Sequence, residues 1–261
     1  MTINFHDAAN ANTYASRDAH SGWYAQMQFI LDGRQIGTVV DIGCGGGIYS
    51  RAWRELGASS VIGLDSSSQM IADAQSATDD AGARFAVADA SSTGLEVSSC
   101  DIVFSRAVIH HLEDHRSAMN EALRILKPGG LLSVQDRTIE DVLQPASPQH
   151  LRAHFFDAFP RLIDVERQRR PVTEEFTSVL VEVGFHEPVI RTFWETRRIY
   201  QSEDDLGTDL RARTGRSILH NLDDTELESL IRTILKASEG RFPLEERDRW
   251  TVWTATKPVE G

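Results

Sequence analysis

The chain is predicted to adopt an α/β fold around a mostly parallel sheet, and two observations support this. Short runs of β-branched and apolar residues alternate with segments of helical periodicity through the first half of the 261 residues. The first of these runs leads directly into an aspartate and a cluster of glycines. This alternation is typical of βαβ units, in which helices connect neighbouring parallel strands.

Seven strands are expected, because seven short apolar runs are bounded by turn residues or by helical segments. Five of the runs lie within residues 38–135 and two lie nearer the end of the chain. They are residues 38–42, 60–64, 84–88, 101–105, 131–135, 189–193 and a last run that starts at 249.

Helices are expected between these strands, because apolar residues recur there at helical spacing. Residues 66–68 offer serine caps, Gly57 and Gly184 mark helix ends, and KPGG at 127–130 ends a further helix. The apolar residues at helical spacing, one group for each expected helix, are Ile48, Ala52 and Leu56; Met70, Ile71, Ala74 and Ala77; Met119, Ala122, Leu123 and Leu126; Phe176, Val179, Leu180 and Val183; and Leu227, Leu230, Ile231 and Ile234.

Other segments interrupt the alternating pattern and look helical. We therefore expect a single domain over residues 1–261 that carries helical additions. The predicted core covers about 36–137, 172–198 and 249–258, and the predicted helical caps cover about 1–34, 138–171 and 200–248.

The composition argues against several classes of protein. The chain has 39 acidic and 27 basic residues, a net charge of −12, which disfavours nonspecific binding to nucleic acid. Arginines gather in residues 160–216, but acids are interleaved with them, so internal ion pairs are expected. There is no apolar run of roughly 18 residues, no secretion-signal pattern, and no cysteine framework from Cys44 and Cys100. We expect a cytoplasmic protein without a membrane partner, and the oligomeric state stays open.

The stretch VVDIGCGGGIYSRAW, residues 39–53, places four glycines between a strand and a helix. Such a turn points backbone N–H groups toward a ligand at the edge of an open sheet, and an ordinary turn would need fewer glycines. A dinucleotide fingerprint requires a small residue at its sixth position, counted with its first glycine as position one, and this chain has Ile48 there. A P-loop does not fit either, because no Gly-Lys-Ser/Thr follows.

The sequence Asp41-Ile42-Gly43-Cys44-Gly45 resembles the first motif of class I S-adenosylmethionine-dependent methyltransferases of the bacterial small-molecule type. Four later stretches resemble further motifs of that family in the same order: GLDSSSQMI (63–71), VADAS (87–91), DIVFSRAVIHHLED (101–114) and ALRILKPGGLLSVQD (122–136). The resemblance implies a Rossmann-like seven-stranded sheet, mostly parallel with an antiparallel last strand, flanked by helices and carrying helical lid insertions. It also implies S-adenosylmethionine as methyl donor, S-adenosylhomocysteine as product, and no metal.

The resemblance also implies roles for residues at the strand ends. Asp41 and the backbone around the glycines would hold the methionine end, and Asp65 would accept hydrogen bonds from the ribose hydroxyls. Asp65 could instead cap a helix, Asp41 could fix the glycine turn, and Met70 could belong to the core. The adenine would lie near Asp89, and the methionine amino group near the end of the fourth strand. The full expected set is Asp41, Gly43, Cys44, Gly45, Asp65, Ser66, Met70, Asp89, Ala90, Ser105 and Arg106.

Methyl transfer needs alignment of the reacting atoms, and it needs a base when the acceptor must lose a proton. His110 is the candidate base because it follows the fourth strand, although the His-His pair could simply shape its loop and His111 is expected to pack. Acceptor contacts are expected from Tyr14, Arg17, Trp23, Asp136 and Arg137. Further candidates are Arg213, Arg216 and His220 for an anionic acceptor, and Phe155, Phe156 and Phe159 for either a lid lining or a core.

These observations favour methyl transfer to a small molecule. A tRNA- or rRNA-modifying methyltransferase is the second hypothesis, and a noncatalytic cofactor-binding protein is the third. No Asn/Asp-Pro-Pro-Tyr/Phe motif follows the fourth strand, which argues against methylation of DNA bases.

Overall fold

The computed structural model describes residues 19–213 and 215–259, so Tyr14 and Arg17 lie outside the described residues. The contacts of the chain group into two compact units. The sheet unit comprises residues 19–136, 172–192 and 251–259, and the helical unit comprises residues 137–171 and 193–250. The single-domain organisation expected from the sequence stays a prediction.

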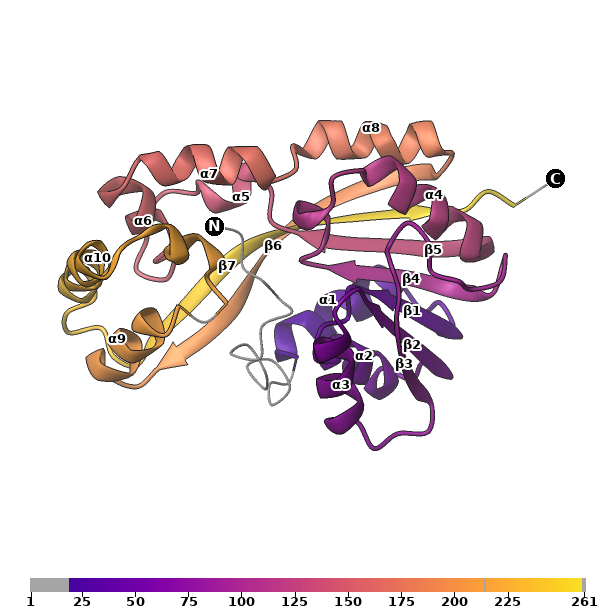
Figure 1. Ribbon diagram of the computed structural model, residues 1–261, viewed down its shortest axis with the longest axis horizontal. Helices are drawn as coiled ribbons and strands as arrows, with labels where there is room; N and C mark the ends of the chain where they lie inside the picture. The colour runs from indigo at the N-terminus through magenta and orange to yellow at the C-terminus, as the bar shows by residue number, and fades with distance from the viewer. Residues whose placement is uncertain (1–18, 214, 260–261) are drawn as a thin grey trace. The chain divides into compact units, whose positions relative to one another are not determined.

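The sheet unit holds most of the strands and the helices that connect them (Figure 1). Its elements are α1 (Ser21–Leu31), β1 (Thr38–Ile42), α2 (Ile48–Glu55), β2 (Ser60–Asp65), α3 (Ser68–Ser76), β3 (Ala83–Val87), β4 (Cys100–Arg106), the 3₁₀ turn η2 (Ile109–His111), α4 (His115–Ile125), β5 (Leu126–Asp136) and α8 (Thr173–Val183).

The helical unit holds the remaining helices and the outer parts of two long strands. Its helical elements are α5 (Ile139–Val142), α6 (Ala153–Ala158), α7 (Arg161–Arg169), α9 (Glu203–Arg211), η3 (Ser217–Asn221) and α10 (Asp224–Ala237). The strands β6 (His186–Tyr200) and β7 (Leu244–Thr256) have residues in both units.

The strands form one seven-stranded sheet in the order β3-β2-β1-β4-β5-β7-β6. The strands β1 to β5 pair in parallel, and β7 pairs antiparallel to β5. Ile42 is in register with Leu64 on β2 and with Ser105 on β4, so these three strands end at the same edge. The predicted fold class is confirmed.

The two faces of the sheet bury different side chains, as the alternation along a strand requires. On one face, Val39 and Ile102 pack with Trp23 of α1 and Trp53 of α2. On the other face, the next residues along the strands pack against α4 and α8, and this cluster includes Val40, Val103, Leu132, Ala122, Ile125, Phe176 and Leu180. Trp23 is fully buried and meets Trp53 edge to face, so it is a core residue and not an acceptor contact.

Several predicted boundaries are wrong. Helix α4 ends at Ile125, before KPGG, and β5 already starts at Leu126. Leu126 pairs with Cys100 and Leu131 pairs with Ile102, so residues 127–130 form an irregularity inside the strand. The strands β6 and β7 are also longer than expected, because they continue into the helical unit. Tertiary packing there stabilises strand residues that show no clear alternating pattern in the sequence.

The helical unit has its own apolar core, in which Phe155 is fully buried and Phe156 is almost so. Phe159 packs against the same cluster, so this helix face belongs to a core and not to a lid lining. The stripe predicted for α10 is also buried here: Leu227, Leu230, Ile231 and Ile234.

A buried ionic network lies beside this core. Arg216 is fully buried and donates to Asp209, to Glu246 at 2.6 Å and to the Tyr200 hydroxyl at 2.8 Å. Arg197 binds the same two carboxylates at 3.0 and 3.1 Å. The two terminal nitrogens of Arg216 therefore serve this network, and its contact with an acceptor stays a prediction.

Among the described residues, no helix is both long enough and apolar enough to cross a bilayer.

Gly63 on β2 offers a test of the packing beneath the sheet edge. A Cβ built on Gly63 would lie 2.5 Å from Cδ1 of Phe85 and 3.0 Å from Sγ of Cys44. We expect Gly63→Ala to lower the free energy of unfolding by about 1–3 kcal/mol through overpacking, measured by urea denaturation. Phe85→Leu in the same chain should recover part of this loss, and strictly additive effects of the two changes would contradict the proposed contact.

Candidate functional site

The candidate site lies at the carboxyl edge of the parallel strands, where β1 and β4 are neighbours. The chain passes from β1 outward to β2 and β3, and later to β4 and β5 on the other side of β1. In open α/β sheets, ligands bind outside the strand ends at such a switch point. The predicted residues Gly43, Asp65, Arg106 and Asp136 all lie at or just after the ends of these strands.

The glycine loop after β1 is closed by its own hydrogen bonds. The N–H groups of Gly43 and Cys44 both donate to the Leu64 carbonyl, at 2.7 and 2.9 Å. The N–H of Gly45 donates to Oδ2 of Asp65 at 2.9 Å. These three amides therefore have protein acceptors, and the role of the loop backbone in cofactor binding stays a prediction.

Asp65 joins the glycine loop to the start of α3. Its Oδ2 accepts from Gly45, and its Oδ1 accepts from the N–H of Ser67 at 2.9 Å. Ser67, and not Asp65, is the N-cap of α3, because its side chain accepts from the N–H of Met70. Since each carboxylate oxygen has two lone pairs, Asp65 keeps the capacity to accept from two ligand hydroxyls as well.

Asp41 is a buried carboxylate directly below the loop. Its side chain accepts a hydrogen bond of 2.6 Å from the Ser50 hydroxyl on α2. Burial raises the pKa of Asp41 to about 7; the Ser50 hydrogen bond opposes this rise and the nearby charge of Asp65 adds to it. Ser50 was not predicted, although its place one turn into the helix after the glycines could have indicated it.

The residues expected around the adenine lie in different environments. Met70 is 4% exposed and packs on α3 with Ile71 and Ala74, as a core residue would. Asp89 is exposed and accepts from the N–H of Ser91 at 2.8 Å. Ser66 is exposed and Ala90 is partly buried, so neither position argues against the predicted role.

The loop after β4 packs directly on the glycine loop. A Cβ built on Gly43 would lie 2.2 Å from Cγ2 of Val108, so the absence of a side chain on Gly43 lets Val108 approach. Ala107 has a φ of 56°, which is unusual for a residue other than glycine and is a form of strain often found at functional sites. Val108 was not predicted, and no pattern in the sequence marks it.

His110 and Asp136 form a buried pair within the sheet unit. Nδ1 of His110 lies 2.9 Å from each carboxylate oxygen of Asp136, and the backbone N–H of His110 lies 3.3 Å from Oδ2. The side chains are 6% and 0% exposed. The rings of His110 and His111 lie 3.9 Å apart between centroids. The sequence singled out His110 and Asp136 separately, and the fold brings them together.

Other predicted residues have protein partners. Ser105 is buried on β4, and Arg106 stacks on the Tyr49 ring with 4.6 Å between its guanidinium carbon and the ring centroid. In the helical unit, Arg137 lies 2.7 Å from Asp248, which Arg152 also contacts. Burial opposes ionisation of Asp248, but these two guanidinium groups hold its pKa well below the ordinary value.

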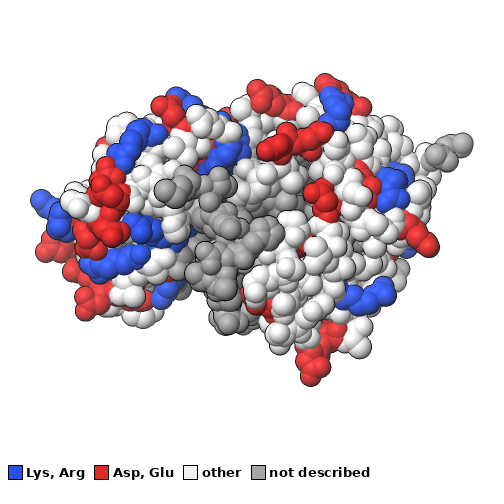
Figure 2. Space-filling model, viewed as in Figure 1, with Lys and Arg blue, Asp and Glu red and all other residues white. Residues whose placement is uncertain are grey.

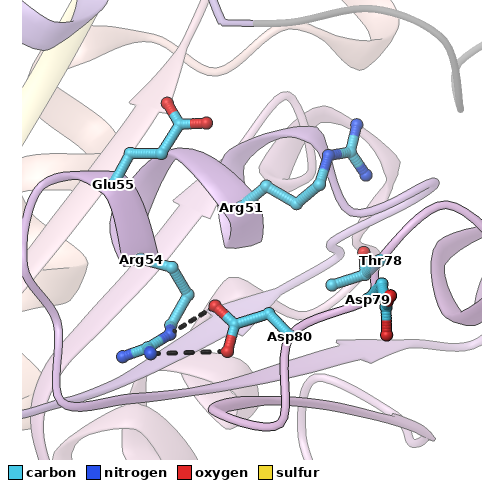
Figure 3. A pocket seen from close by; sticks show the side chains of 6 residues that line it. All are labelled: Arg51, Arg54, Glu55, Thr78, Asp79 and Asp80. Atoms are coloured by element: carbon cyan, nitrogen blue, oxygen red, sulfur yellow. Dashed lines mark hydrogen bonds and ion pairs between the residues drawn. The ribbon is translucent and has the colours of Figure 1, made fainter.

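A separate hollow of about 320 Å³ lies between α2 and the loop that precedes β3 (Figure 3). Arg54 and Asp80, which both line this hollow, form a bidentate ion pair. The loop residues come before β3, so the hollow lies away from the carboxyl edge, and none of the predicted site residues lines it. Its lining is Arg51, Arg54, Glu55, Thr78, Asp79 and Asp80.

The edge fits a cationic ligand better than a pyrophosphate. Asp41 and Asp65 bring two carboxylates to the glycine loop, and the amides that would bind phosphate oxygens are already bonded. A Cβ built on Gly45 would meet no described atom within 4 Å, so space lies beside this residue. Within the described part of the chain, no group of three or more His, Cys, Asp or Glu side chains is placed to hold a metal ion.

The raised pKa of Asp41 predicts a pH-dependent stability. The folded state holds this proton more tightly than the unfolded chain, so the stabilisation is fully present below about pH 4 and is lost as the pH rises toward 7. In the wild type, we expect the free energy of unfolding to fall by about 1 kcal/mol per pH unit in this range. We expect Asp41→Asn to remove this fall, because asparagine does not titrate while its amide oxygen can still accept from Ser50. Denaturation at several pH values checks this, with the exposed Asp79→Asn as control. Parallel pH curves for Asp41→Asn and the wild type would contradict it.

Comparison with known proteins identifies the core of the sheet unit. The family described as "Methyltransferase domain" matches residues 40–134, from β1 to β5. The malonyl-[acyl-carrier protein] O-methyltransferase of Salmonella typhimurium is 32% identical over 126 residues. This match covers 48% of the chain and 48% of that enzyme, so the chain matches about half the length of this relative.

Two longer matches agree with this. The trans-aconitate 2-methyltransferase of Escherichia coli is 27% identical over 216 residues, which cover 80% of the chain and 79% of that enzyme. A solved putative methyltransferase from an antibiotic biosynthesis pathway of Anabaena variabilis has the same fold, with a TM-score of 0.70 and 18% identity over 90% of this chain and 98% of that one. Residues 40–134 are therefore similar to a methyltransferase domain, and the chain resembles a methyltransferase over most of its length.

Proposed function

We propose that the protein transfers the methyl group of S-adenosylmethionine to a small-molecule acceptor. The observation that carries this proposal is the pair of carboxylates, Asp41 and Asp65, at a glycine loop in the switch point of a methyltransferase fold. When bound, the cofactor supplies a methyl group on a positively charged sulfur. By their names, the relatives above methylate trans-aconitate and a malonyl-[acyl-carrier protein]. We propose that the acceptor of this chain is likewise a small metabolite or a small acyl group.

Each carboxylate has a distinct role in this proposal. Asp65 accepts from the ribose hydroxyls through the lone pairs that Gly45 and Ser67 do not use. Asp41 supports the loop through the hydrogen bond that it accepts from Ser50 and lies beneath the methionine end. Asp89, Ser66 and Ala90 hold the adenine, and the backbone of Ser105 and Arg106 faces the methionine amino group. We further propose that the reaction needs no metal ion and that the protein is cytoplasmic, as predicted from the sequence.

The charge distribution favours a small molecule over RNA. The arginines of residues 160–216 are largely neutralised by carboxylates: Arg161 by Glu226, Arg169 and Arg170 by Glu166, Arg198 by Asp205, and Arg211 by Glu228. On the face drawn in Figure 2, basic and acidic side chains are intermixed. RNA binding requires an uncompensated positive surface, because its affinity comes largely from phosphate contacts.

A screen for the acceptor tests the proposed function. The protein is incubated with S-adenosylmethionine and fractions of a cell extract, donor consumption is followed, and the methylated product is identified by mass spectrometry. We expect donor consumption in a small-molecule fraction that survives nuclease treatment. Consumption only in RNA-containing fractions would support the RNA-modifying alternative. Cofactor binding without transfer in any fraction would support the noncatalytic one.

Asp65 is predicted to bind the cofactor directly. We expect Asp65→Ala to weaken S-adenosylhomocysteine binding by about 1–3 kcal/mol, because hydrogen bonds to a charged group are lost, and calorimetry measures this. The exposed Asp79→Ala serves as the matched control, and thermal denaturation verifies that both variants are folded. Equal affinities for Asp65→Ala and the wild type would remove Asp65 from the ribose site.

His110 is predicted to act on the acceptor and not on cofactor binding. We expect His110→Ala to keep S-adenosylhomocysteine affinity near the wild-type value and to lower kcat by roughly 10²–10⁴-fold, the range of a general base. Steady-state kinetics with saturating acceptor measures this. An unchanged kcat would exclude His110 from the reaction.

A further inference from the structure

We propose that Glu121 on α4 is a positioning residue for the adenine end of the cofactor. Glu121 holds the loop of residues 88–95, which follows β3 and carries Asp89, and it does not touch the ligand itself. In this way Glu121 determines how strongly the protein prefers a base that carries a 6-amino group. The inference rests on the proposed function and deepens it for the cofactor site.

Thr93 attaches the loop to α4. Its backbone N–H donates to Oε1 of Glu121 at 2.8 Å, and its hydroxyl donates to the same oxygen. Thr93 and Glu121 are each 7% exposed, whereas Asp89, Ser91 and Ser92 on the same loop are exposed. Thr93 is therefore a buried anchor in a loop whose other polar side chains are open to solvent.

Arg124, one turn further along α4, completes the attachment. It donates to both oxygens of Glu121, from Nε to Oε2 at 2.7 Å and from Nη2 to Oε1 at 2.8 Å. Nη2 also donates to the Leu95 carbonyl at 2.7 Å. The hydrogen bonds from Arg124, more than any other effect and against burial, lower the pKa of Glu121 to about 2, so this carboxylate is ionised at neutral pH. The two side chains thus hold the loop at Thr93 and at Leu95.

A buried carboxylate is a costly way to fill this space. Buried ion pairs are often no more stabilising than apolar side chains of similar size, because both charges lose their water. What Glu121 adds over an apolar residue is direction, since its oxygens accept only from donors that lie in one arrangement. We therefore expect Glu121 to define the shape of the loop more than the stability of the sheet unit.

The first part of the loop carries the expected adenine contact. The N–H of Ala88 donates to the Asp65 carbonyl at 3.0 Å, which joins the start of the loop to the end of β2. The N–H of Ser91, at 2.8 Å, and its hydroxyl both donate to Oδ1 of Asp89. These bonds lower the pKa of Asp89, so its carboxylate is ionised and can accept from a 6-amino group through Oδ2.

A closed turn transmits the position of Thr93 to Asp89. Ser92, the residue before Thr93, forms an isolated antiparallel bridge with Asp89, and its N–H donates to the Asp89 carbonyl at 3.0 Å. Without the Glu121 acceptor, Thr93 is released and the Asp89 carboxylate loses its fixed direction. Because a hydrogen bond weakens steeply when its angle is poor, the contact with an amino group is the interaction that suffers.

The first test compares two ligands that differ only at the base. Calorimetry measures the binding of S-adenosylhomocysteine and of its analogue with hydrogen in place of the 6-amino group. We expect the wild type to prefer S-adenosylhomocysteine by about tenfold, the effect of a hydrogen bond to a charged group. We expect Glu121→Ala to lower this preference below about threefold, while its affinity for the analogue changes less than about twofold.

Leu180→Ala is the control for lost stability, because it leaves a cavity in the core beside α4 without touching the loop, and it should keep the full preference. A folded Glu121→Ala variant with the wild-type preference would overturn the inference, and so would a wild type that binds both ligands equally. A wild type that binds neither ligand would remove the proposed function itself, and the inference with it.

Thr93 offers a milder pair of matched variants. Thr93→Val removes the hydroxyl that donates to Glu121 at nearly the same volume, whereas Thr93→Ser keeps it. We expect the preference to fall at least about twofold in Thr93→Val and to stay at the wild-type value in Thr93→Ser. Equal preferences in these two variants would contradict the inference, and this comparison decides the question if Glu121→Ala does not fold.

Asp89→Asn shows whether Glu121 acts through Asp89. Asparagine can keep the Ser91 bonds through its amide oxygen, but its amide nitrogen cannot accept from the ligand. We expect Asp89→Asn to abolish the preference and Glu121→Ala to change it no further in that background. A preference that survives in Asp89→Asn and is lost only when Glu121→Ala is added would give Glu121 a different partner and overturn the inference.

Discussion

The site depends on one steric constraint, the close approach of Val108 to Gly43. A side chain at Gly43 would occupy the space of the valine methyl group, so glycine at this position lets the loop after β4 pack on the loop after β1. These loops follow neighbouring parallel strands, and their contact brings the carboxylates of β1 and β2 into one region with the His110 turn. The cofactor edge and the candidate base therefore share one packed structure.

Buried charge is used differently in the two units. In the helical unit, the guanidinium groups of Arg197 and Arg216 face the carboxylates of Asp209 and Glu246, so the buried charges are paired. Removing one partner from such a network leaves an uncompensated buried charge, so these residues stabilise one arrangement of that unit. In the sheet unit, Asp41 is buried and accepts a hydrogen bond from the Ser50 hydroxyl, and burial raises its pKa. A perturbed pKa of this kind is often found at functional sites.

The fold by itself does not name the reaction, since one fold can host many chemistries. Three features of the site favour methyl transfer: two carboxyl groups at the glycine loop, amides that are already bonded, and no described atom within 4 Å of a Cβ built on Gly45. The His110–Asp136 pair at the ends of the neighbouring strands is the candidate for contact with the acceptor.

The sequence by itself determined the sheet, its connecting helices and the motif residues at the strand ends, because local periodicity and glycine spacing reflect backbone needs within a few residues. It also indicated Asp41, Asp65 and His110 individually. Only the tertiary structure decided which groups meet: Ser50 with Asp41, Val108 with Gly43, and Asp136 with His110. It also decided that Trp23 and Arg216 are buried and that the amides of the glycine loop bond internally. These facts depend on packing between segments far apart in the chain, which no local pattern records.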